Sequence, residues 1–318
     1  MERPYILHMF TPGRQMSPFD INMAADAGYQ MVVPYCEVGV DAIAGLTQDT
    51  IFSRGPKGVA RTGIFIGGRD ALLAADMVQR SKAAMVEPFV VSVMADPSGA
   101  YTTAAAMVAC VETALRHHHA QGLEGQRIVI LGGTGPVGRI AGVIAAQAGA
   151  EVFLSSRNGI DVAEEAAQQT GQRFGVTLHG LSGGDLAAVR ASIAEADVLL
   201  ACTAAGVQVV PAEALGVARR LKVAADVNAV PPEGIAGIGV MDDGKPLADT
   251  SAVGIGALSV GNVKYQTQQR LLVRMQGAEK ALVLSFPEAF AVAREFLVEK
   301  LAKDAAKAVA ERAAGKPV

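Results

Sequence analysis

Long apolar runs and an excess of one charge are both missing from this sequence of 318 residues. Hydrophobic residues make up 51% of the chain, yet no stretch approaches the roughly 20 consecutive apolar residues that spanning a bilayer requires. The formal net charge is −3, with both signs interspersed, which provides neither a basic stripe for nucleic acid nor an acidic tail. We therefore expect a soluble protein whose partners are small molecules, not nucleic acid or membrane.

Cysteine is also scarce, and the three cysteines are too scattered to form a framework. Cys36, Cys110 and Cys202 make no C-x-x-C motif and have no histidine at metal-ligand spacing, which argues against a disulfide scaffold and a zinc site. We expect reduced thiols and no bound metal. The start of the chain leads from Met1–Pro4 directly into a strand-like segment, without the features of a secretory or transit leader. A cytoplasmic location is the resulting expectation.

Glycine, by contrast, is plentiful and punctuates an alternation of strands and helices. The 35 glycines and few aromatic residues fit an α/β protein with many tight strand-to-helix turns. The pattern restarts after Ala120–Gly125, whose small and polar residues resemble a domain linker. The predicted strands are Tyr5–Phe10, Met31–Pro34, Arg61–Ile66, Val90–Met94, Arg127–Leu131, Glu151–Leu154, Val176–His179, Asp197–Cys202 and Lys222–Asp226. The predicted helices between them are Pro18–Ala27, Arg69–Ala84, Thr102–His118, Pro136–Ala148, Ala163–Phe174 and Asp185–Ala194.

This pattern predicts two α/β domains with the active site in the cleft between them. Residues 1–120 form an α/β domain with a mostly parallel sheet, joined by C-terminal helices within residues 280–318. Residues 121–279 form a Rossmann-type, doubly wound parallel sheet. A long amphipathic helix over Pro287–Lys316 is expected to pack on the first domain or on another subunit.

A glycine-rich loop follows the first strand of the second domain and opens a helix. Between a strand and a helix, its G-x-G-x-x-G spacing is a more specific sign of dinucleotide binding than the same spacing elsewhere. In such a loop the glycines allow a tight turn, close approach of a pyrophosphate and close helix–strand packing. The alternative is a glycine-rich turn of an ordinary α/β protein, which the βα units that follow disfavour. The predicted cofactor-binding residues of the loop are Gly133, Thr134, Gly135, Pro136, Val137 and Gly138.

The end of the second strand in this domain indicates which dinucleotide binds. NAD enzymes usually place a carboxylate there for the ribose 2′-hydroxyl, but this chain has Ser155, Ser156, Arg157 and Asn158. Because Arg157 can pair with a 2′-phosphate, NADP is favoured. An arginine that merely starts a helix is the alternative, and NAD remains possible. Two further strand-end loops are expected to border the nicotinamide, through Thr203, Ala204, Asn228 and Ala229.

No acid/base pair for alcohol chemistry is evident. The motif Y-x-x-x-K does not occur, and the run His117-His118-His119 stands at a helix end, where consecutive residues face different directions. These absences favour a reaction that needs only hydride transfer, such as oxidation of a methylene between two nitrogens whose lone pairs stabilise the cation formed.

Several segments along the chain together match one enzyme family. They are Ser17–Asp20, Phe65–Gly68, Asp96–Gly99, Thr102–Ala106, Gly133–Gly138, Asp226–Pro232 and Gly254–Leu258. These segments resemble the bacterial NAD(P)-dependent methylene-tetrahydromethanopterin dehydrogenases over nearly the whole chain. His8–Pro12 and Gly261–Gln268 are similar to the branch that accepts both NAD and NADP.

This resemblance implies hydride transfer from methylene-tetrahydromethanopterin to NAD(P)+, giving the methenyl form, in the one-carbon metabolism of formaldehyde oxidation in methylotrophic bacteria. It also implies a homo-oligomer, either a trimer or a hexamer. The segment beyond about Leu297 is longer than usual for the family, and we assign it no role.

The resemblance also suggests residues for the substrate. Asp20 could bind the pterin edge or favour the developing cation, or it could cap its own helix. Lys264, expected in a glycine-flanked turn near the domain junction, could orient the substrate or be solvated. Neither is expected to act as an acid or base. The other predicted substrate-binding residues lie in strand-end loops and the helix that follows: Ser17, Gly67, Gly68, Asp96, Ser98, Thr102 and Thr103.

Two other functions remain compatible with the sequence. A methylene-tetrahydrofolate dehydrogenase would act on the same kind of five-membered ring, and the sequence separates the two carriers poorly. A non-catalytic NADP sensor would also lack an acid/base group. It would not need the second ligand surface that the strand-end loops of the first domain form.

Overall fold

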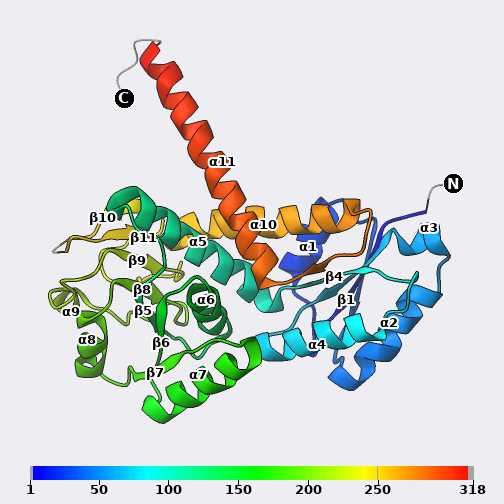
Figure 1. Cartoon of the computed structure of the whole chain (residues 1–318), viewed down its shortest axis with the longest axis horizontal. Helices are drawn as coiled ribbons and strands as arrows, with labels where there is room; N and C mark the ends of the chain where they lie inside the picture. Colours follow the sequence, from blue (N-terminus) through cyan, green and yellow to red (C-terminus); the bar gives the residue numbers. More distant parts are fainter. Residues whose placement is uncertain (1–2, 249, 314–318) are drawn as a thin grey trace.

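The computed structural model describes residues 3–248 and 250–313, which fold into two α/β lobes (Figure 1). The sheet of the first lobe is parallel throughout, with the strand order β12-β4-β3-β1-β2. Helices cover it, so that β3 is buried along its whole length. The strands of this lobe are β1 (Ile6–Phe10), β2 (Met31–Tyr35), β3 (Thr62–Ile66), β4 (Ser92–Ala95) and β12 (Val283–Leu284). Its helices are α1 (Pro18–Asp26), η1 (Val40–Ala42), α2 (Ile43–Phe52), α3 (Pro56–Val59), α4 (Ala71–Ala84) and η2 (Pro97–Gly99).

The second lobe contains the predicted doubly wound sheet, with the strand order β10-β11-β9-β8-β5-β6-β7. All neighbouring strands are parallel except β10, which joins the edge in the antiparallel direction. The strands are β5 (Arg127–Leu131), β6 (Glu151–Ser156), β7 (His179–Ser182), β8 (Val198–Ala201), β9 (Val223–Asp226), β10 (Asp243–Pro246) and β11 (Val253–Ile255). The helices are α6 (Pro136–Gln147), α7 (Ile160–Phe174), α8 (Leu186–Ala194) and α9 (Ala212–Leu215).

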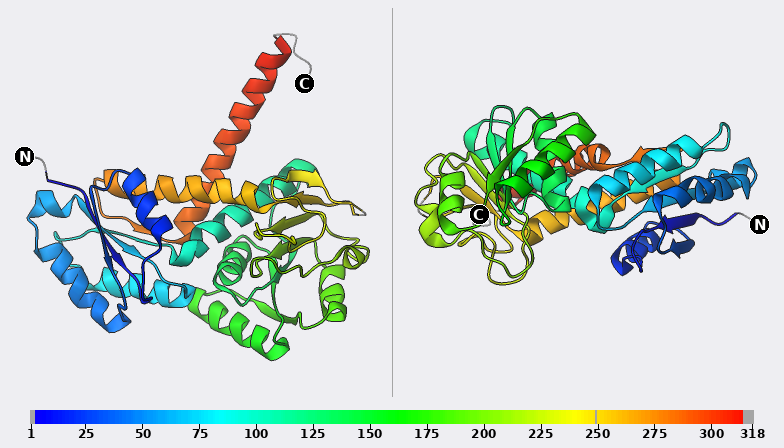
Figure 2. Two further views of the ribbon diagram at one scale, coloured as in Figure 1. Left: turned by 180° about the vertical axis from the view of Figure 1, so that it is seen from behind. Right: turned by 90° about the horizontal axis from the view of Figure 1, so that it is seen from below.

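Two long helices, α5 (Ala100–His119) and α10 (Ala257–Gly277), connect the lobes (Figure 2). They pack against each other, and α5 also packs against α6 of the second lobe, while α10 also packs against α1 and β4 of the first. Alanine makes this packing possible, because residues such as Ala105 and Ala109 are fully buried and bring the helix axes close together. The two lobes therefore share one continuous apolar core.

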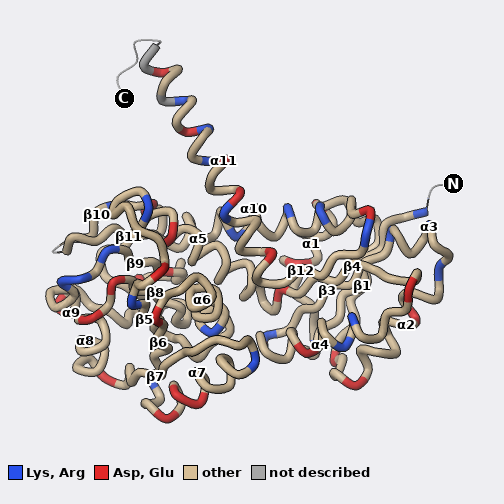
Figure 3. The backbone as a smooth tube through the Cα atoms, in the orientation of Figure 1, with Lys and Arg blue, Asp and Glu red and all other residues tan. Residues whose placement is uncertain are grey.

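The C-terminal helix α11 (Phe286–Ala313) confirms the long helix predicted for the tail, whose last residues, 314–316, lie outside the described part. Its first half packs on α5 and α10, with ion pairs from Arg294 to Glu112 and from Arg270 to Glu299. Its second half projects from the body, and basic and acidic positions are interspersed along it (Figure 3). No helix in the described part of the chain is both long enough and apolar enough to cross a membrane.

A few elements differ from the sequence prediction. The strand predicted over Val176–His179 begins only at His179, because α7 ends at Phe174 and Val176 still donates a hydrogen bond to the carbonyl of Gly171. Helix α2 was not predicted, since Gly45 and β-branched residues weaken its helical pattern. The short strands β10, β11 and β12 were also missed, because they have only four, three and two residues and carry little pattern of their own. The partner of β12, β4, also lies in a distant part of the chain.

Candidate active site

Each sheet has a point at which the winding of the chain reverses, and such points bind ligands. The reversal lies between β1 and β3 in the first lobe and between β5 and β8 in the second, where a crevice opens at the carboxyl ends of the strands. A cavity lies at each point, of about 770 Å³ in the first lobe and about 330 Å³ in the second. We call them the first-lobe and second-lobe cavities, and together they form the candidate site.

The glycine-rich loop lines one side of the second-lobe cavity. A Cβ atom on Gly133 or Gly138 would come within 2.7 Å of backbone atoms, so the turn itself requires glycine at both positions. Gly135 differs, because its Cβ would meet only the carbonyl oxygen of Gly132, at 3.4 Å. Its missing side chain therefore leaves room for a ligand. Helix α6 begins at Pro136, so its unpaired N–H groups lie at the edge of this cavity, where a phosphate can bind.

The end of β6 supplies another side of the second-lobe cavity. Ser155 and Ser156 are buried there, whereas Arg157 is exposed. No carboxylate in the described part of the chain forms an ion pair with Arg157, so its guanidinium is available to an anion. The predicted cofactor residues that line this cavity are Thr134, Gly135, Ser155, Ser156, Arg157, Thr203 and Ala204. Lining residues that the sequence analysis missed include Gly132, Gly183, Cys202 and Val207.

The loop after β9 lies outside this lining, and hydrogen bonds within the protein hold it in place. The amide of Asn228 is engaged inside the protein: its oxygen accepts hydrogen bonds from the N–H groups of Gly206 and Val230, both at 3.0 Å. Its nitrogen donates to the carbonyl oxygen of Pro232 at 2.8 Å. Asn228 thus holds the loops after β8 and β9 together, while Ala229 is exposed. The other predicted residues outside the lining are Gly133, Pro136, Val137 and Gly138, which build the turn behind it.

The loops after β1, β3 and β4 form the first-lobe cavity. A buried carboxylate, Asp20, and two exposed cations, Arg14 and Arg69, line it together, so it suits a polar ligand. Nothing in the sequence singled out the two arginines. The predicted substrate residues in its lining are Ser17, Asp20, Gly68 and Ser98. Those outside the lining are Gly67, Asp96, Thr102, Thr103 and Lys264.

Asp20 lies at the centre of a buried network between α1 and α10. Its side chain is 3% exposed, and it accepts a hydrogen bond from Nε2 of Gln268 at 2.7 Å instead of capping its own helix. Oε1 of Gln268 accepts a hydrogen bond from the ammonium of Lys264, also at 2.7 Å. That ammonium lies 3.7 Å from the ring centre of Phe19, a cation–π contact. Asp20 and Lys264 were predicted from the family resemblance, whereas Gln268, which joins them, was not.

Burial shifts the pKa values of the two charged groups in this network, Asp20 and Lys264. Burial raises the pKa of Asp20 to about 6, and the nearby carboxylate of Asp96 adds to the effect, whereas the hydrogen bond from Gln268 opposes it. Burial also lowers the pKa of Lys264, against the attraction of Asp96 and Asp20. Asp20 is therefore mainly ionised at neutral pH and becomes protonated near pH 6.

Asp96 and Thr102 stabilise the start of α5. The carboxylate of Asp96 accepts hydrogen bonds from the N–H groups of Tyr101 and Thr102 and from the Thr102 hydroxyl, at 3.0, 3.1 and 2.6 Å. Both residues are buried. They hold the turn in which Ser98 adopts a φ of +54° and reaches the first-lobe cavity.

Lys264 lies in the middle of α10, so the prediction of a turn at this position was wrong. Gly256 and Gly261 had suggested the turn. Gly256 instead caps α10, where it packs against the backbone of Gly239, and Gly261 is accommodated within the helix. The helical backbone places Lys264 and Gln268 one turn apart on the same face, which explains their hydrogen bond.

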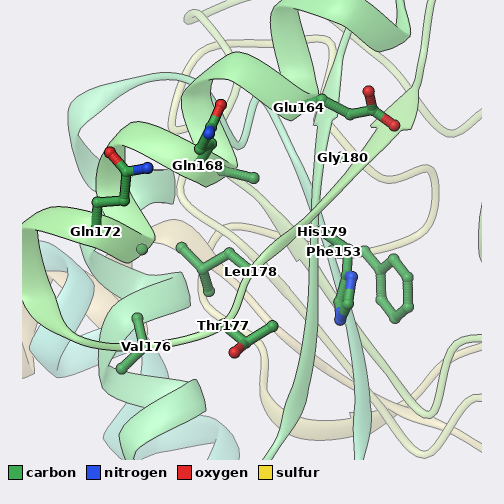
Figure 4. A pocket seen from close by; sticks show the side chains of 11 residues that line it. Phe153, Glu164, Gln168, Gln172, Val176, Thr177, Leu178, His179 and Gly180 are labelled. Atoms are coloured by element: carbon green, nitrogen blue, oxygen red, sulfur yellow. The ribbon is translucent and has the colours of Figure 1, made fainter.

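A further cavity, of about 600 Å³, lies between α7 and β7 (Figure 4). It contains Gln168, Gln172 and the stacked rings of Phe153 and His179, whose centroids are 5.0 Å apart. The cavity lies at the amino end of β7, whereas ligands of doubly wound sheets bind at the carboxyl ends of the strands. It includes none of the predicted cofactor or substrate residues, and we do not assign it to the active site.

Proteins of known family are similar to this chain in sequence. Residues 18–98 match the family described as methylene-tetrahydromethanopterin dehydrogenase, N-terminal. The chain is also 50% identical over 290 residues to the NAD(P)-dependent methylenetetrahydromethanopterin dehydrogenase of Methylorubrum extorquens, covering 91% of this chain and 98% of that protein. The chain belongs to the methylene-tetrahydromethanopterin dehydrogenase family. It is an oxidoreductase, and the family predicted from its motifs is confirmed.

A second sequence relative and two solved structures are also similar to this chain. The bifunctional protein MdtA of Methylorubrum extorquens is 31% identical over 290 residues, covering 91% of this chain and 98% of that protein. The ligand-free 5-ketofructose reductase of a Gluconobacter species has a TM-score of 0.51 at 18% identity, covering 92% of this chain and 99% of that one. The quinate dehydrogenase of Corynebacterium glutamicum has a TM-score of 0.50 at 13% identity, covering 93% and 99%. The two structures support the α/β fold with a Rossmann-type lobe.

Proposed function

We propose that this dehydrogenase transfers a hydride from the methylene bridge of methylene-tetrahydromethanopterin to NAD(P)+ and leaves the methenyl form of the carrier. One observation carries the proposal: a glycine-rich phosphate cradle at one switch point is matched by a cavity with a buried carboxylate, Asp20, at the other. The identity with the Methylorubrum extorquens enzyme supports this choice of carrier.

The residues of the second-lobe cavity fit a dinucleotide. Gly135 leaves room for a pyrophosphate, the start of α6 offers N–H groups to it, and Arg157 can contact the adenosine end. When bound, the nicotinamide ring supplies the acceptor for the hydride. We infer that residues 121–279 bind this cofactor and that the remaining segments, 1–120 and 280–318, bind the carrier, with the reaction in a cleft between them. Lys264 and Gln268 lie within residues 121–279, but α10 places them beside Asp20 of the first lobe, so these two residues contribute to the carrier side.

In this mechanism the C–H bond of the methylene group breaks, and its electron pair leaves with the hydride. The carbon left behind is cationic and shares its charge with the flanking nitrogens. The carboxylate of Asp20 stabilises this developing charge, and no proton has to move. Holding the two reacting carbons together supplies much of the rate.

We propose NADP as the preferred cofactor, because Arg157 is exposed in the second-lobe cavity beside two serines. A charge-assisted bond to the 2′-phosphate is worth on the order of 1.5–3 kcal/mol. We therefore expect Arg157→Ala to raise the KM for NADP about ten-fold or more and to leave the KM for NAD within a few-fold. Steady-state kinetics with both cofactors measure this. Arg219→Ala, at an exposed arginine outside the cavity, is the control. An equal loss for both cofactors would assign Arg157 a structural role.

The pH dependence of the rate should report the charge of Asp20. Protonation below about pH 6 removes the charge that stabilises the product cation, so kcat should fall as the pH decreases through 6. Between neutral and mildly alkaline pH the rate should be nearly constant, since the hydride step moves no proton. Deuterium in the methylene group should slow that step. A single-turnover rate without an isotope effect, or one that rises with each pH unit, would contradict direct hydride transfer.

The carrier itself is tested by following NADPH formation with methylene-tetrahydromethanopterin and with methylene-tetrahydrofolate. We expect much faster oxidation of the first, because the first-lobe cavity selects between the two. Comparable kcat/KM values would reject the choice of carrier but retain the reaction. If neither carrier reduced NAD or NADP, the alternative of a non-catalytic NADP sensor would be favoured.

We also propose that the chain assembles as a homo-oligomer, a trimer or hexamer, as the family resemblance implies. Sedimentation velocity of the full chain at several concentrations tests this. A monomer at all concentrations would reject it.

A further inference from the structure

We propose that Gln268 is a positioning residue that keeps Asp20 and Lys264 from forming a direct ion pair, so that the negative charge of Asp20 stays available to the substrate. This inference rests on the function proposed above. It adds a role for a residue that touches neither cavity: Gln268 acts through the two charged groups that it joins.

The contacts of Gln268 are specific and hidden from solvent. The residue is 0% exposed, and each half of its amide is engaged: Nε2 donates to Oδ1 of Asp20 and Oε1 accepts from Nζ of Lys264, both at 2.7 Å. The residues come from different elements, because Asp20 is on α1 and the other two are one turn apart on α10. Folding therefore inserts a neutral amide between two opposite charges.

An amide suits this place because it satisfies both neighbours without neutralising either. A carboxamide offers a donor to the carboxylate and an acceptor to the ammonium. A direct ion pair would satisfy them too, but the Asp20 charge would then already be balanced before the substrate cation develops. Catalysis gains only from interactions that strengthen toward the transition state, so a carboxylate that is not yet paired is the more useful one. An apolar residue here would leave two buried charged groups short of a partner.

The surroundings of Asp20 determine what a change at Gln268 should do. The groups that face Asp20 are Asp96 from the η2 loop, Lys264 and Gln268 from α10, and Ser17 at the start of α1. Of these, Asp96 raises the pKa of Asp20, while the other three lower it. A third carboxylate at position 268 would therefore oppose ionisation of Asp20.

Two variants of Gln268 separate positioning from packing. Gln268→Met has a similar volume but makes neither hydrogen bond, and we expect kcat to fall about ten-fold or more with an unchanged Kd for NADP. Gln268→Glu keeps the shape of the side chain and an oxygen that accepts a hydrogen bond from Lys264. If Gln268 serves only to fill space, this variant should therefore behave as the wild type. A positioning role predicts that the pH midpoint of kcat rises by about one unit or more from its wild-type value. Gln266→Met, two residues earlier on the same helix, is the control and should behave as the wild type.

A second readout keeps this test independent of the carrier. Carbon-detected NMR of the unliganded full chain follows the titration of the Asp20 carboxyl, which should occur at higher pH in Gln268→Glu than in the wild type. If no carrier reduces NADP, the proposed function fails, but this titration still decides whether Gln268 acts on Asp20. A wild-type Asp20 titration in Gln268→Glu, or a kcat within two-fold of wild type in folded Gln268→Met, would overturn the inference.

Discussion

Gly135→Val should abolish dinucleotide binding while the chain remains folded. Gly135 has extended backbone angles, φ −76° and ψ 168°, which valine adopts readily. Its Cβ would meet one backbone oxygen at 3.4 Å, an ordinary contact, so the substitution places its methyl groups in the second-lobe cavity. Those methyl groups occupy the space that a pyrophosphate needs. We expect the Kd for NADP and for NAD to rise by about 100-fold or more, equivalent to about 2.7 kcal/mol.

The matched variant Gly138→Ala should lose stability, in contrast to Gly135→Val, which should lose dinucleotide binding. A Cβ at Gly138 would lie 2.7 Å from Cα of Gly133, and backbone atoms cannot move aside as a flexible side chain can. Such overpacking costs roughly 1–3 kcal/mol, so its melting temperature should drop by several degrees. Fluorescence titration with each dinucleotide and thermal melting measure both effects. Normal NADP affinity in Gly135→Val would remove this loop from the cofactor site.

Asp20→Asn should lower activity and raise stability at neutral pH. The amide retains the shape of the side chain and an oxygen for Gln268, but it carries no charge to stabilise the substrate cation. By analogy with other electrostatic groups in active sites, we expect kcat to fall by about 10- to 100-fold, with little change in the Kd for NADP. We expect the free energy of unfolding at pH 7 to rise by about 1–3 kcal/mol, because a buried charge has been removed.

The pH dependence of stability checks the second part. The pKa of Asp20 is raised to about 6 in the folded chain from its ordinary value of 3.8, so the folded state binds more protons between these values. The wild type should gain stability as the pH falls from about 6 to about 4, and Asp20→Asn should lack this gain. Asp26→Asn, at an exposed position on the same helix, is the control. Lower stability of Asp20→Asn at pH 7 would show that the carboxylate supports the fold and not the reaction.

Local spacing was sufficient to predict several of the residues that line the second-lobe cavity. The positions of Gly133, Gly135 and Gly138 follow from a strand, a tight turn and a helix that are contiguous in the chain, and so does the place of Arg157 after the next strand. The structure brings Gly135 and Arg157 to one cavity, because parallel strands end at the same edge of a sheet. The family resemblance added Asp20, which lines the other cavity.

The sequence by itself determined the α/β alternation, the glycine-rich turn and the enzyme family, since these depend on patterns within short segments. The tertiary structure alone decided the partners of those residues. Gln268 bonds to Asp20 across 248 positions, and no local periodicity encodes such a contact. Helix α10 likewise placed Lys264 on a buried face where its glycines had suggested a turn, because packing against α5 outweighs weak local signals. The charges of the candidate site are therefore set by long-range packing, whereas its glycine-rich turn is set by local backbone geometry.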